Sequence, residues 1–405
     1  MKFKVQKERL LQVLQHVRKV ISAREAIPIF EDMYFTFDDS MMTVEASDGE
    51  QRMEETLSVE SLEEPRTFSV WPYTLIRAIK GMEDQMLTFE VGEYQMTVNH
   101  SCGSFRVPIK DGAEYMDMRK DKPDIESDRC ETISYEAPGL RSILTKCRFA
   151  MANDELRPAL NGVVVNLTKH FADYASSDGH VLARIRKEPI MYGNKKQEVT
   201  FIIPSKVVNT LLKILPSTGD VDIVYQEAYK EKGEDRKEHR AVASIFIDDE
   251  IVYTFYPIDG RFPNYNNVIP TAHLYEIKAN RKGLIKSLER LTNFTSNSGM
   301  IELVYDNDLL KMEAKDVDLE IYGNEGLPIE VTPKMKSPIR QGMKDCCLLP
   351  ILKTLTTENV IIKVTDASRA VIIEPDPQPT IEKITMLLMP MMKLNATHGK
   401  RESIT

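Results

Sequence analysis

The sequence predicts an α+β protein of three similar domains, in which each domain has two helices packed on antiparallel sheets. The first observation behind this prediction is an internal repeat: the same order of strands and helices recurs three times, with a period of roughly 130–140 residues. The second is a segregation of charge between the expected helices and the remainder of the chain. A chain of 405 residues is also too long for one ordinary hydrophobic core. We expect domains at residues 1–128, 129–272 and 273–394, followed by a mobile tail at 395–405.

Each repeat begins with a short strand and an amphipathic helix. In the first repeat, MKFKVQKERLLQVLQHVRKVIS, the spacing places Leu10, Leu14 and Val17 on one helical face. TISYEAPGLRSILTKCRFA and YEIKANRKGLIKSLERLTNF show the same pattern at the start of the second and third repeats. A second helix follows in each repeat, in WPYTLIRAIKGM, PSKVVNTLLKIL and DCCLLPILKTL. The six expected helices span residues 7–21, 73–82, 139–149, 205–215, 281–292 and 345–355.

Between its two helices, each repeat contains a pair of strands joined by a tight turn. MMTVEASDGEQRMEE and HFADYASSDGHVLARI alternate apolar and polar residues around an Asp-Gly step, which is typical of a β-hairpin, and LLKMEAKDVDLEIYG has a similar pattern. We expect a solvated hairpin loop at 228–240, which is highly charged. The stretch from Gly323 to Lys344 is rich in Gly and Pro and is expected to be a long loop. Pro350 falls inside the sixth expected helix, where it removes a backbone hydrogen bond unless the helix starts near it.

The six expected helices carry sixteen Lys and Arg residues against three Asp and Glu, although the whole chain has a formal net charge of −9. Surface helices usually mix both signs, so this segregation is not typical. If all six helices face one way, they form a positive surface that attracts phosphates without reading a base sequence. The alternative is that these are ordinary solvated side chains on exposed helix faces. We favour that alternative for any one helix, and a shared electrostatic purpose for the six together.

The sequence does not support several other classes of protein. It has no run of about 18 apolar residues, as a membrane-spanning helix requires, and its N-terminus lacks the hydrophobic segment of a signal peptide, so we expect a cytoplasmic protein. The five cysteines include no CxxC pair and the seven histidines no HExxH or HxH pair, which favours inert thiols over a disulfide framework or a zinc site. We therefore expect no metal and no cofactor.

A hydrolase is one alternative that the residues leave open. It would use Asp178 and His180, in SSDGH, as an acid–base pair, with Asp259 as a further carboxylate. No nucleophile elbow, glycine-rich phosphate loop or metal-ligand spacing accompanies them. Because an Asp-Gly step between strands is mostly turn chemistry, we expect no catalytic residue in this chain.

Four sequence blocks carry a resemblance to a known family. They are FAMANDELRPALNG (149–162), SSDGHVLA (176–183), DGRFPNYNNVIP (259–270) and the near-terminal MPM (389–391). With these blocks, and in one consistent order from Met1 to about Lys393, the sequence resembles the bacterial DNA polymerase III beta subunit, the replicative sliding clamp. The resemblance implies a head-to-tail homodimeric ring that encircles double-stranded DNA without sequence preference. It further implies that the ring tethers the replicative polymerase and confers processivity in DNA replication without catalysis of its own.

The resemblance implies a set of DNA-contacting residues. They are Arg24, Lys80, Arg157 and Lys206. The first lies in the loop after the first helix, the second and fourth lie on later helices, and the third lies in a loop that is near DNA in the family. Two positions depart from the family's pattern. Asp154 stands where the family often has a neutral polar residue and Ser205 where it often has arginine, so DNA contact is expected to be weaker or differently distributed.

The resemblance also implies a pocket between the second and third domains. In the family it binds short extended peptides, with glutamine and leucine or phenylalanine anchors, from DNA polymerases, the clamp loader and repair proteins. The matching positions are Leu160, Ser177, Gly179, His180, Val181, Leu182, Pro263, Asn267, Val268, Ala370, Met389, Pro390 and Met391. Val181 replaces the family's usual arginine, Asn267 a basic residue and Ala370 a serine, so we expect a more apolar pocket with a different partner motif. Flexible methionine side chains suit a surface that accepts several partners.

Contacts between two copies of the chain are implied at two facing sheet edges. Phe105 and Val107 fall on the edge strand of the first domain, and Phe294 falls at the facing edge of the third. An unpaired edge strand needs a partner, and pairing between the copies would supply one. The altered pocket and the added tail leave a further alternative open, a clamp-fold paralogue with a specialised partner-binding role.

Overall fold

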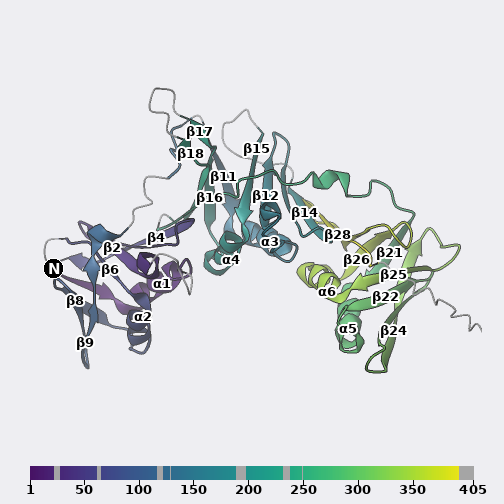
Figure 1. Ribbon diagram of the computed structural model, residues 1–405, viewed down its shortest axis with the longest axis horizontal. Coiled ribbons are helices and arrows are strands. Elements are labelled where there is room, and N and C mark those ends of the chain that lie inside the picture. The colour runs from purple at the N-terminus through teal and green to yellow at the C-terminus, as the bar shows by residue number, and fades with distance from the viewer. Residues whose placement is uncertain are drawn as a thin grey trace, which may run out of the picture. The chain divides into compact units, whose positions relative to one another are not determined.

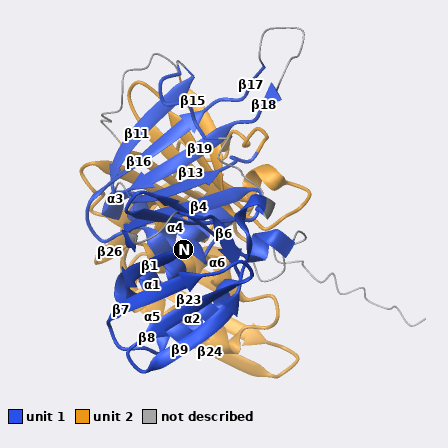
Figure 2. Ribbon diagram, turned by 90° about the vertical axis from the view of Figure 1, so that its left-hand side faces the viewer, with its two compact units in different colours: residues 1–142, 191–197, 206–258 blue, residues 143–190, 198–205, 259–405 orange. Residues whose placement is uncertain are grey.

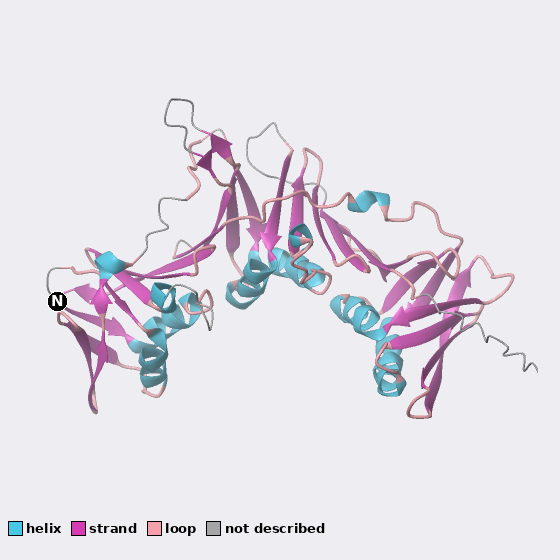
Figure 3. Cartoon of the chain, viewed as in Figure 1, coloured by secondary structure: helices cyan, strands magenta, loops and turns pink. Residues whose placement is uncertain are grey.

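The computed structural model describes residues 1–21, 28–61, 65–115, 122–127, 129–187, 198–230, 238–248 and 250–391. This part of the chain contains six α-helices and antiparallel strand pairs (Figure 3), which confirms the α+β class. The chain divides into two compact units (Figure 2). Unit 1 comprises residues 1–142, 191–197 and 206–258, and unit 2 comprises residues 143–190, 198–205 and 259–405. The division follows the sheets and falls inside the second expected repeat, so the three expected domain boundaries stay predictions.

All six expected helices are present, with ends close to the expected ones. They are α1 (Lys7–Val17), α2 (Pro72–Lys80), α3 (Ala137–Arg148), α4 (Ser205–Ile214), α5 (Arg281–Leu291) and α6 (Asp345–Thr354). Their apolar stripes are buried, as Leu10 and Leu14 of α1 illustrate. α1 ends at Val17 rather than near residue 21, because Val20 and Ile21 donate to carbonyls three residues back and tighten the last turn. Among the described residues, no helix is long and apolar enough to cross a membrane.

Unit 1 contains a nine-stranded and a five-stranded sheet, of orders β10-β6-β2-β3-β4-β20-β19-β16-β11 and β5-β1-β7-β8-β9. α1 packs against α2 and lies on β3 and β4 (Figure 1). The charged stretch at 228–240 begins and ends in the short strands β17 and β18, which pair with each other. The strands are β1 (Lys2–Gln6), β2 (Met33–Asp38), β3 (Met41–Ser47), β4 (Gln51–Ser58), β5 (Glu60–Ser61), β6 (Phe68–Val70), β7 (Met86–Val91), β8 (Gln95–His100), β9 (Gly103–Pro108), β10 (Lys110–Asp111), β11 (Cys130–Glu136), β16 (Asp220–Gln226), β17 (Tyr229–Lys230), β18 (Glu238–His239), β19 (Val242–Ile247) and β20 (Ile251–Phe255).

Unit 2 contains one twelve-stranded sheet of order β15-β12-β13-β14-β28-β27-β26-β21-β24-β23-β22-β25. α5 and α6 pack side by side in this unit (Figure 3). Pro350 lies inside α6, which begins at Asp345, so the helix continues past it with one backbone hydrogen bond fewer. The strands are β12 (Gly162–Leu167), β13 (Ala172–Ser177), β14 (Val181–Lys187), β15 (Val199–Pro204), β21 (Tyr275–Asn280), β22 (Met300–Tyr305), β23 (Leu309–Asp316), β24 (Ile321–Thr332), β25 (Ile339–Lys344), β26 (Asn359–Val364), β27 (Val371–Asp376) and β28 (Glu382–Leu388).

The expected loop from Gly323 to Lys344 is wrong, because strands β24 and β25 occupy most of this stretch. β24 pairs with β23 as far as Pro328 and with β21 from Ile329 onward. The amide of Ile329 donates to the backbone carbonyl of Asp308, which precedes β23. Successive backbone nitrogens point to opposite sides of a strand, so the nitrogen of Pro328 faces β21. The pairing with β21 begins only at Ile329, so the missing amide hydrogen of Pro328 removes no hydrogen bond between strands. Gly323 allows close packing instead of a turn, since a Cβ there would lie 2.9 Å from Cδ2 of Phe294.

Candidate functional site

The turn between β13 and β14 is built by the side chains of its own sequence. The Asp178 carboxylate accepts hydrogen bonds from the amides of His180 (2.7 Å) and Val181 (2.8 Å). The Ser177 hydroxyl donates to the Val181 carbonyl at 2.7 Å, and Gly179 has a φ of +95°, which only glycine adopts without strain. The carboxylate therefore holds the turn, and the His180 side chain is left exposed. These hydrogen bonds are typical of the Asp-Gly turn that the sequence predicted.

The end of β28 lies directly beside this turn. Val181 is paired with Leu388, and the amide of Met389 donates to the His180 carbonyl at 2.9 Å. The Met391 amide then donates to the carbonyl of Gly342, on β25, at 2.7 Å. Residues 389–391 are thus fixed by backbone hydrogen bonds on both sides, and the DGH turn and the MPM block of the sequence are neighbours in unit 2.

The implied pocket residues of unit 2 differ in burial, and Ser177, Pro390 and Met391 are partly buried. The buried ones are Leu160, Val181, Leu182 and Ala370. The exposed ones include Val268 and Met389, whose side chains are 58% and 43% exposed and are apolar. Leu160 belongs to the short 3-10 turn η4 (Pro158–Leu160), and the preceding Arg157 donates to the carbonyl of Asp178 at 3.4 Å. The structure therefore joins the LRPAL, SSDGH and MPM segments through hydrogen bonds between neighbours.

The segment 259–270, which carries Pro263, Asn267 and Val268, lies on strands β12–β14. It contains the 3-10 turn η5 (Tyr265–Asn267), and the Tyr265 ring is buried. The amide nitrogen of Asn166, on β12, donates to the Tyr265 hydroxyl at 2.7 Å, and this hydroxyl lies 3.4 Å from Oδ2 of Asp173. Gly260 lies against Ala159, next to Leu160. These contacts bring the start of the segment beside the η4 turn.

A buried cluster centred on Asp173 was not foreseen from the sequence. The Asp173 side chain is 3% exposed and accepts hydrogen bonds from Arg184 (2.8 Å) and Arg186 (2.6 Å) of β14. Burial by itself raises the pKa of Asp173, but the hydrogen bonds from both arginines outweigh it and the net pKa is lowered. The sequence does contain a signal for this cluster: pairing the two strands around the Asp-Gly turn places Asp173 opposite Arg186, a pair of opposite charges.

The implied DNA-contacting residues differ in what their side chains already bind. Lys80 is exposed at the C-terminal end of α2 and has no ion pair among the described residues. Lys206 forms an ion pair with Asp48, whose carboxylate also accepts the Gln51 amide. Arg157 donates to Asp154 at 2.8 Å, and this hydrogen bond lowers the pKa of the Asp154 carboxyl. Arg24 lies outside the described residues.

Many of the helix cations are likewise engaged within the protein. At least six of the sixteen form ion pairs with carboxylates: Lys7–Glu8, Arg9–Glu55, Lys146–Glu382, Lys206–Asp48, Arg290–Glu325 and Lys353–Glu289. Among the described residues, the exposed helix cations without an ion pair include Arg77, Lys80, Lys213, Lys282 and Lys286. The positive charge that the helices can offer to a ligand is therefore smaller than their composition indicates.

The implied dimer residues lie on or beside strands at the edge of a sheet. β9, which carries Phe105 and Val107, is the last strand of its sheet. Val107 is 3% exposed, so its side chain belongs to the core of unit 1 and only its backbone is at the edge. In unit 2, β24 pairs with β23 alone over residues 321–328, and Phe294 of the adjoining 3-10 turn η6 (Thr292–Phe294) packs against this edge. Both units therefore present an edge segment with an aromatic side chain on it or next to it.

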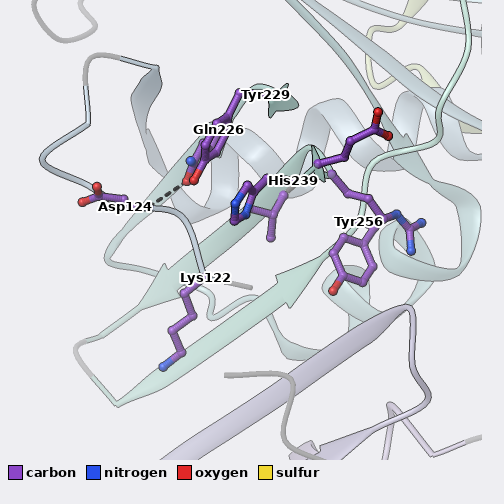
Figure 4. A pocket seen from close by; sticks show the side chains of 9 residues that line it. Lys122, Asp124, Gln226, Tyr229, His239 and Tyr256 are labelled. Atoms are coloured by element: carbon purple, nitrogen blue, oxygen red, sulfur yellow. Dashed lines mark hydrogen bonds between the residues drawn. The ribbon is translucent and has the colours of Figure 1, made fainter. Parts of the chain in front are cut away.

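Unit 1 contains a cavity of about 390 Å³ that none of the expected sites uses (Figure 4). Tyr229 stacks on His239 at 4.3 Å, and the Arg240 guanidinium lies over the Tyr256 ring at 4.1 Å. Its cations are paired, Lys122 with Glu54 and Arg240 with Glu50. In the described part of the chain, no group of three or more His, Cys, Asp or Glu residues could hold a metal ion.

Two family models match the chain. Residues 1–118 match the DNA polymerase III beta subunit, N-terminal domain, and residues 136–264 match the central domain of the same subunit. Among curated relatives, the beta sliding clamp of Pseudomonas putida is 23% identical over 92% of this chain and 96% of its own length. The beta sliding clamp of Bacillus subtilis is 24% identical over 96% of this chain and 99% of its own length.

The fold is also similar to solved structures. A DNA polymerase sliding clamp from Pseudomonas aeruginosa matches with a TM-score of 0.84 at 21% identity, over 97% of this chain and 99% of that one. A DNA polymerase sliding clamp from Bacillus subtilis matches with a TM-score of 0.84 at 20% identity, over the same shares of the two chains. The similarity thus spans nearly the whole of this chain, the twelve-stranded sheet of unit 2 included.

The Asp173 cluster predicts a specific pH dependence of stability. Because the folded state lowers the pKa of Asp173, its stabilising contribution is complete above the unfolded value of about 4 and is lost as the pH falls below it. Asp173→Asn leaves two partly buried arginines without a charged partner and should cost about 3–5 kcal/mol. We expect a lower midpoint of thermal unfolding at neutral pH, with the difference from wild type shrinking towards pH 3. Glu313→Gln, on β23 and without an ion pair among the described residues, is the matched control and should change little.

Proposed function

The chain belongs to the family of the DNA polymerase III beta subunit, since the two family models together match more than half of it, and we propose that it acts as a DNA sliding clamp in replication. In this role two copies form a head-to-tail ring around double-stranded DNA. The ring tethers DNA polymerase and other proteins, and the chain itself needs to catalyse nothing. A cytoplasmic location is part of this proposal, because a clamp acts on replicating DNA.

The observation that carries this proposal is that a chain with the fold of a sliding clamp also has exposed cations on its helices. Arg77 and Lys80 extend from the last turn of α2, and Lys282 and Lys286 extend from α5 one helical turn apart. Such side chains bind phosphate oxygens on either strand and carry no information about base sequence. A ring that is closed around DNA needs no tight binding, so a few weak contacts suffice and sliding remains possible.

The two sheet edges support the homodimer. In the part of the chain that the structure describes, no strand pairs with the outer side of β9 or with the outer side of β24 at residues 321–328. Main-chain pairing between them would satisfy amide and carbonyl groups that a monomer leaves to water. Phe105 and Phe294 lie beside the two edges and would be covered by the partner copy.

The pocket residues of unit 2 support a peptide-binding role. Backbone hydrogen bonds fix Met389–Met391 beside the DGH turn, while the side chains of Val268 and Met389 remain exposed. Exposed apolar side chains on a rigid backbone are suited to the leucine or phenylalanine anchor of a short peptide. Val181 is buried and paired with Leu388, so this position offers no charged group to the peptide. We expect partners with apolar rather than acidic residues at that point.

A second candidate, a clamp paralogue with one specialised partner, is favoured by two ion pairs. Asp154 forms an ion pair with Arg157, and Asp48 forms one with Lys206. Both cations are implied DNA contacts, and each would have to leave its carboxylate to bind a phosphate. A primer-extension assay with the loaded ring separates the candidates. Longer products with the cell's own replicative polymerase support the general role, and unchanged product lengths despite retention on DNA support the specialised one.

Charge reversal on α2 tests the DNA contact. Arg77→Glu with Lys80→Glu should lower retention on nicked circular DNA, and the logarithmic slope of retention against salt should fall by about one unit for each phosphate that the variant no longer binds. Linearising the circle should release the wild-type ring. Lys311→Glu, an exposed lysine on β23, is the control and should leave retention unchanged. Equal retention of the α2 variant and the wild type would mean that this face does not meet DNA.

A mass measurement in solution tests the ring. We expect a particle of twice the 46.3 kDa of one chain. Phe294→Asp places a charge at the β24 edge and should shift the particle towards the monomer mass, whereas Leu274→Asp, an exposed apolar residue outside that edge, should not. A Phe294→Asp protein that is folded by circular dichroism and still dimeric contradicts the proposed interface.

Binding of a synthetic peptide with glutamine, leucine and phenylalanine anchors tests the pocket. Val268→Glu adds a charge at an apolar contact and should weaken binding by roughly tenfold or more. Ile381→Glu is the matched control, because Ile381 is similarly exposed (62%) but precedes the other end of β28 from Met389. If both variants bind as tightly as the wild type, the pocket lies elsewhere.

A further inference from the structure

The segment 259–270 depends on one side chain for its polar attachment to unit 2. Apart from the η5 turn it has no regular structure, and its own backbone hydrogen bonds, such as that from Val268 to the Tyr265 carbonyl, are internal. Among the described residues, the hydrogen bonds that join this segment to the strands are those of the Tyr265 hydroxyl with Asn166 and Asp173. The Phe262 ring is also buried and meets Tyr265 edge-on at 6.1 Å, but ring packing alone allows sliding and rotation.

The partners of this hydroxyl are themselves fixed in orientation. Thr200 of β15 donates to the side-chain oxygen of Asn166 at 2.7 Å, which leaves the amide nitrogen of Asn166 to donate to Tyr265. On the other side, Arg184 and Arg186 hold the Asp173 carboxylate in one place. Burial, followed by the charge of Asp173, raises the pKa of Tyr265 to about 12, so the hydroxyl keeps its proton and can donate. Each group in this chain of hydrogen bonds is thus assigned as a donor or an acceptor.

We propose that Tyr265 is a positioning residue for the peptide pocket, whose hydroxyl sets the place of Pro263, Asn267 and Val268 by anchoring their segment to Asn166 and Asp173. The proposal rests on the peptide-binding function proposed above. The Tyr265 side chain is buried, so it offers almost no surface to a peptide. The anchored Tyr265 hydroxyl fixes the position of the exposed Val268 side chain, three residues further on, relative to strands β12–β14. A loosened segment would have to be ordered anew at each binding event, which weakens affinity without removing any contact.

The test compares Tyr265→Phe with wild type in the full-length protein. The variant keeps the ring and removes only the hydroxyl. We expect affinity for the synthetic glutamine–leucine–phenylalanine peptide to fall roughly five- to tenfold. Amide hydrogen exchange should rise in residues 259–270 and stay unchanged in β12–β15. Tyr305→Phe, which removes the hydroxyl of a buried tyrosine on β22, is the matched control and should change neither readout.

A second variant, Asn166→Ala, acts on the same hydroxyl from the strand. If Tyr265 works through Asn166, the double variant should bind no more weakly than the weaker single variant, since both remove one interaction. Unchanged peptide affinity and unchanged exchange in Tyr265→Phe overturn the proposal. Faster exchange throughout unit 2 also overturns it, because the residue is then a general stabiliser. Failure of the wild type to bind any peptide overturns the proposed peptide-binding function instead, and the exchange of residues 259–270 still decides the positioning role.

Discussion

The pairing of β14 with β28 is the interaction on which the rest of unit 2 depends. Seven residue pairs, from Val181–Leu388 to Lys187–Glu382, join two strands that are far apart in the sequence. The ladder buries Ile185, Ile384 and Met386 and brings the DGH turn to the end of β28. Backbone hydrogen bonds do not require particular side chains. This explains how the fold can match a solved clamp with a TM-score of 0.84 at only 21% identity.

Much of the fold could be predicted from the sequence because its helices obey a clear local period. All six helices and the DG-containing hairpins were found from spacing alone. β24 was not, since Gly323 and Pro328 are typical of loops, and only the paired strands and the Phe294 ring explain their presence in a strand. The prediction of a loop failed because the contacts that favour Gly323 and Pro328 in a strand come from other parts of the chain.

The same limit applies to the candidate site. The resemblance implied that the DGH turn and the MPM block belong to one pocket, and the structure joins them by a backbone hydrogen bond from Met389 to His180. The helix charge was overestimated, because partners such as Asp48 and Glu382 come from distant segments that local counting ignores. Asp173 was missed for a related reason: one carboxylate between apolar residues has no local signature, and its two arginines are found only through the register of β13 and β14.

Strand β24 determines how a pulling force would act on unit 2. One continuous strand is hydrogen-bonded to β23 along its first part and to β21 along its last, so it belongs to two runs of the sheet at once. A force along this strand acts in shear on both ladders, and many hydrogen bonds must break together before either part slides. A long loop from Gly323 to Lys344, as the Gly- and Pro-rich sequence predicted, would have no such ladder of hydrogen bonds. The shared strand therefore links the β21 and β23 runs of the twelve-stranded sheet without a break in the backbone hydrogen bonding.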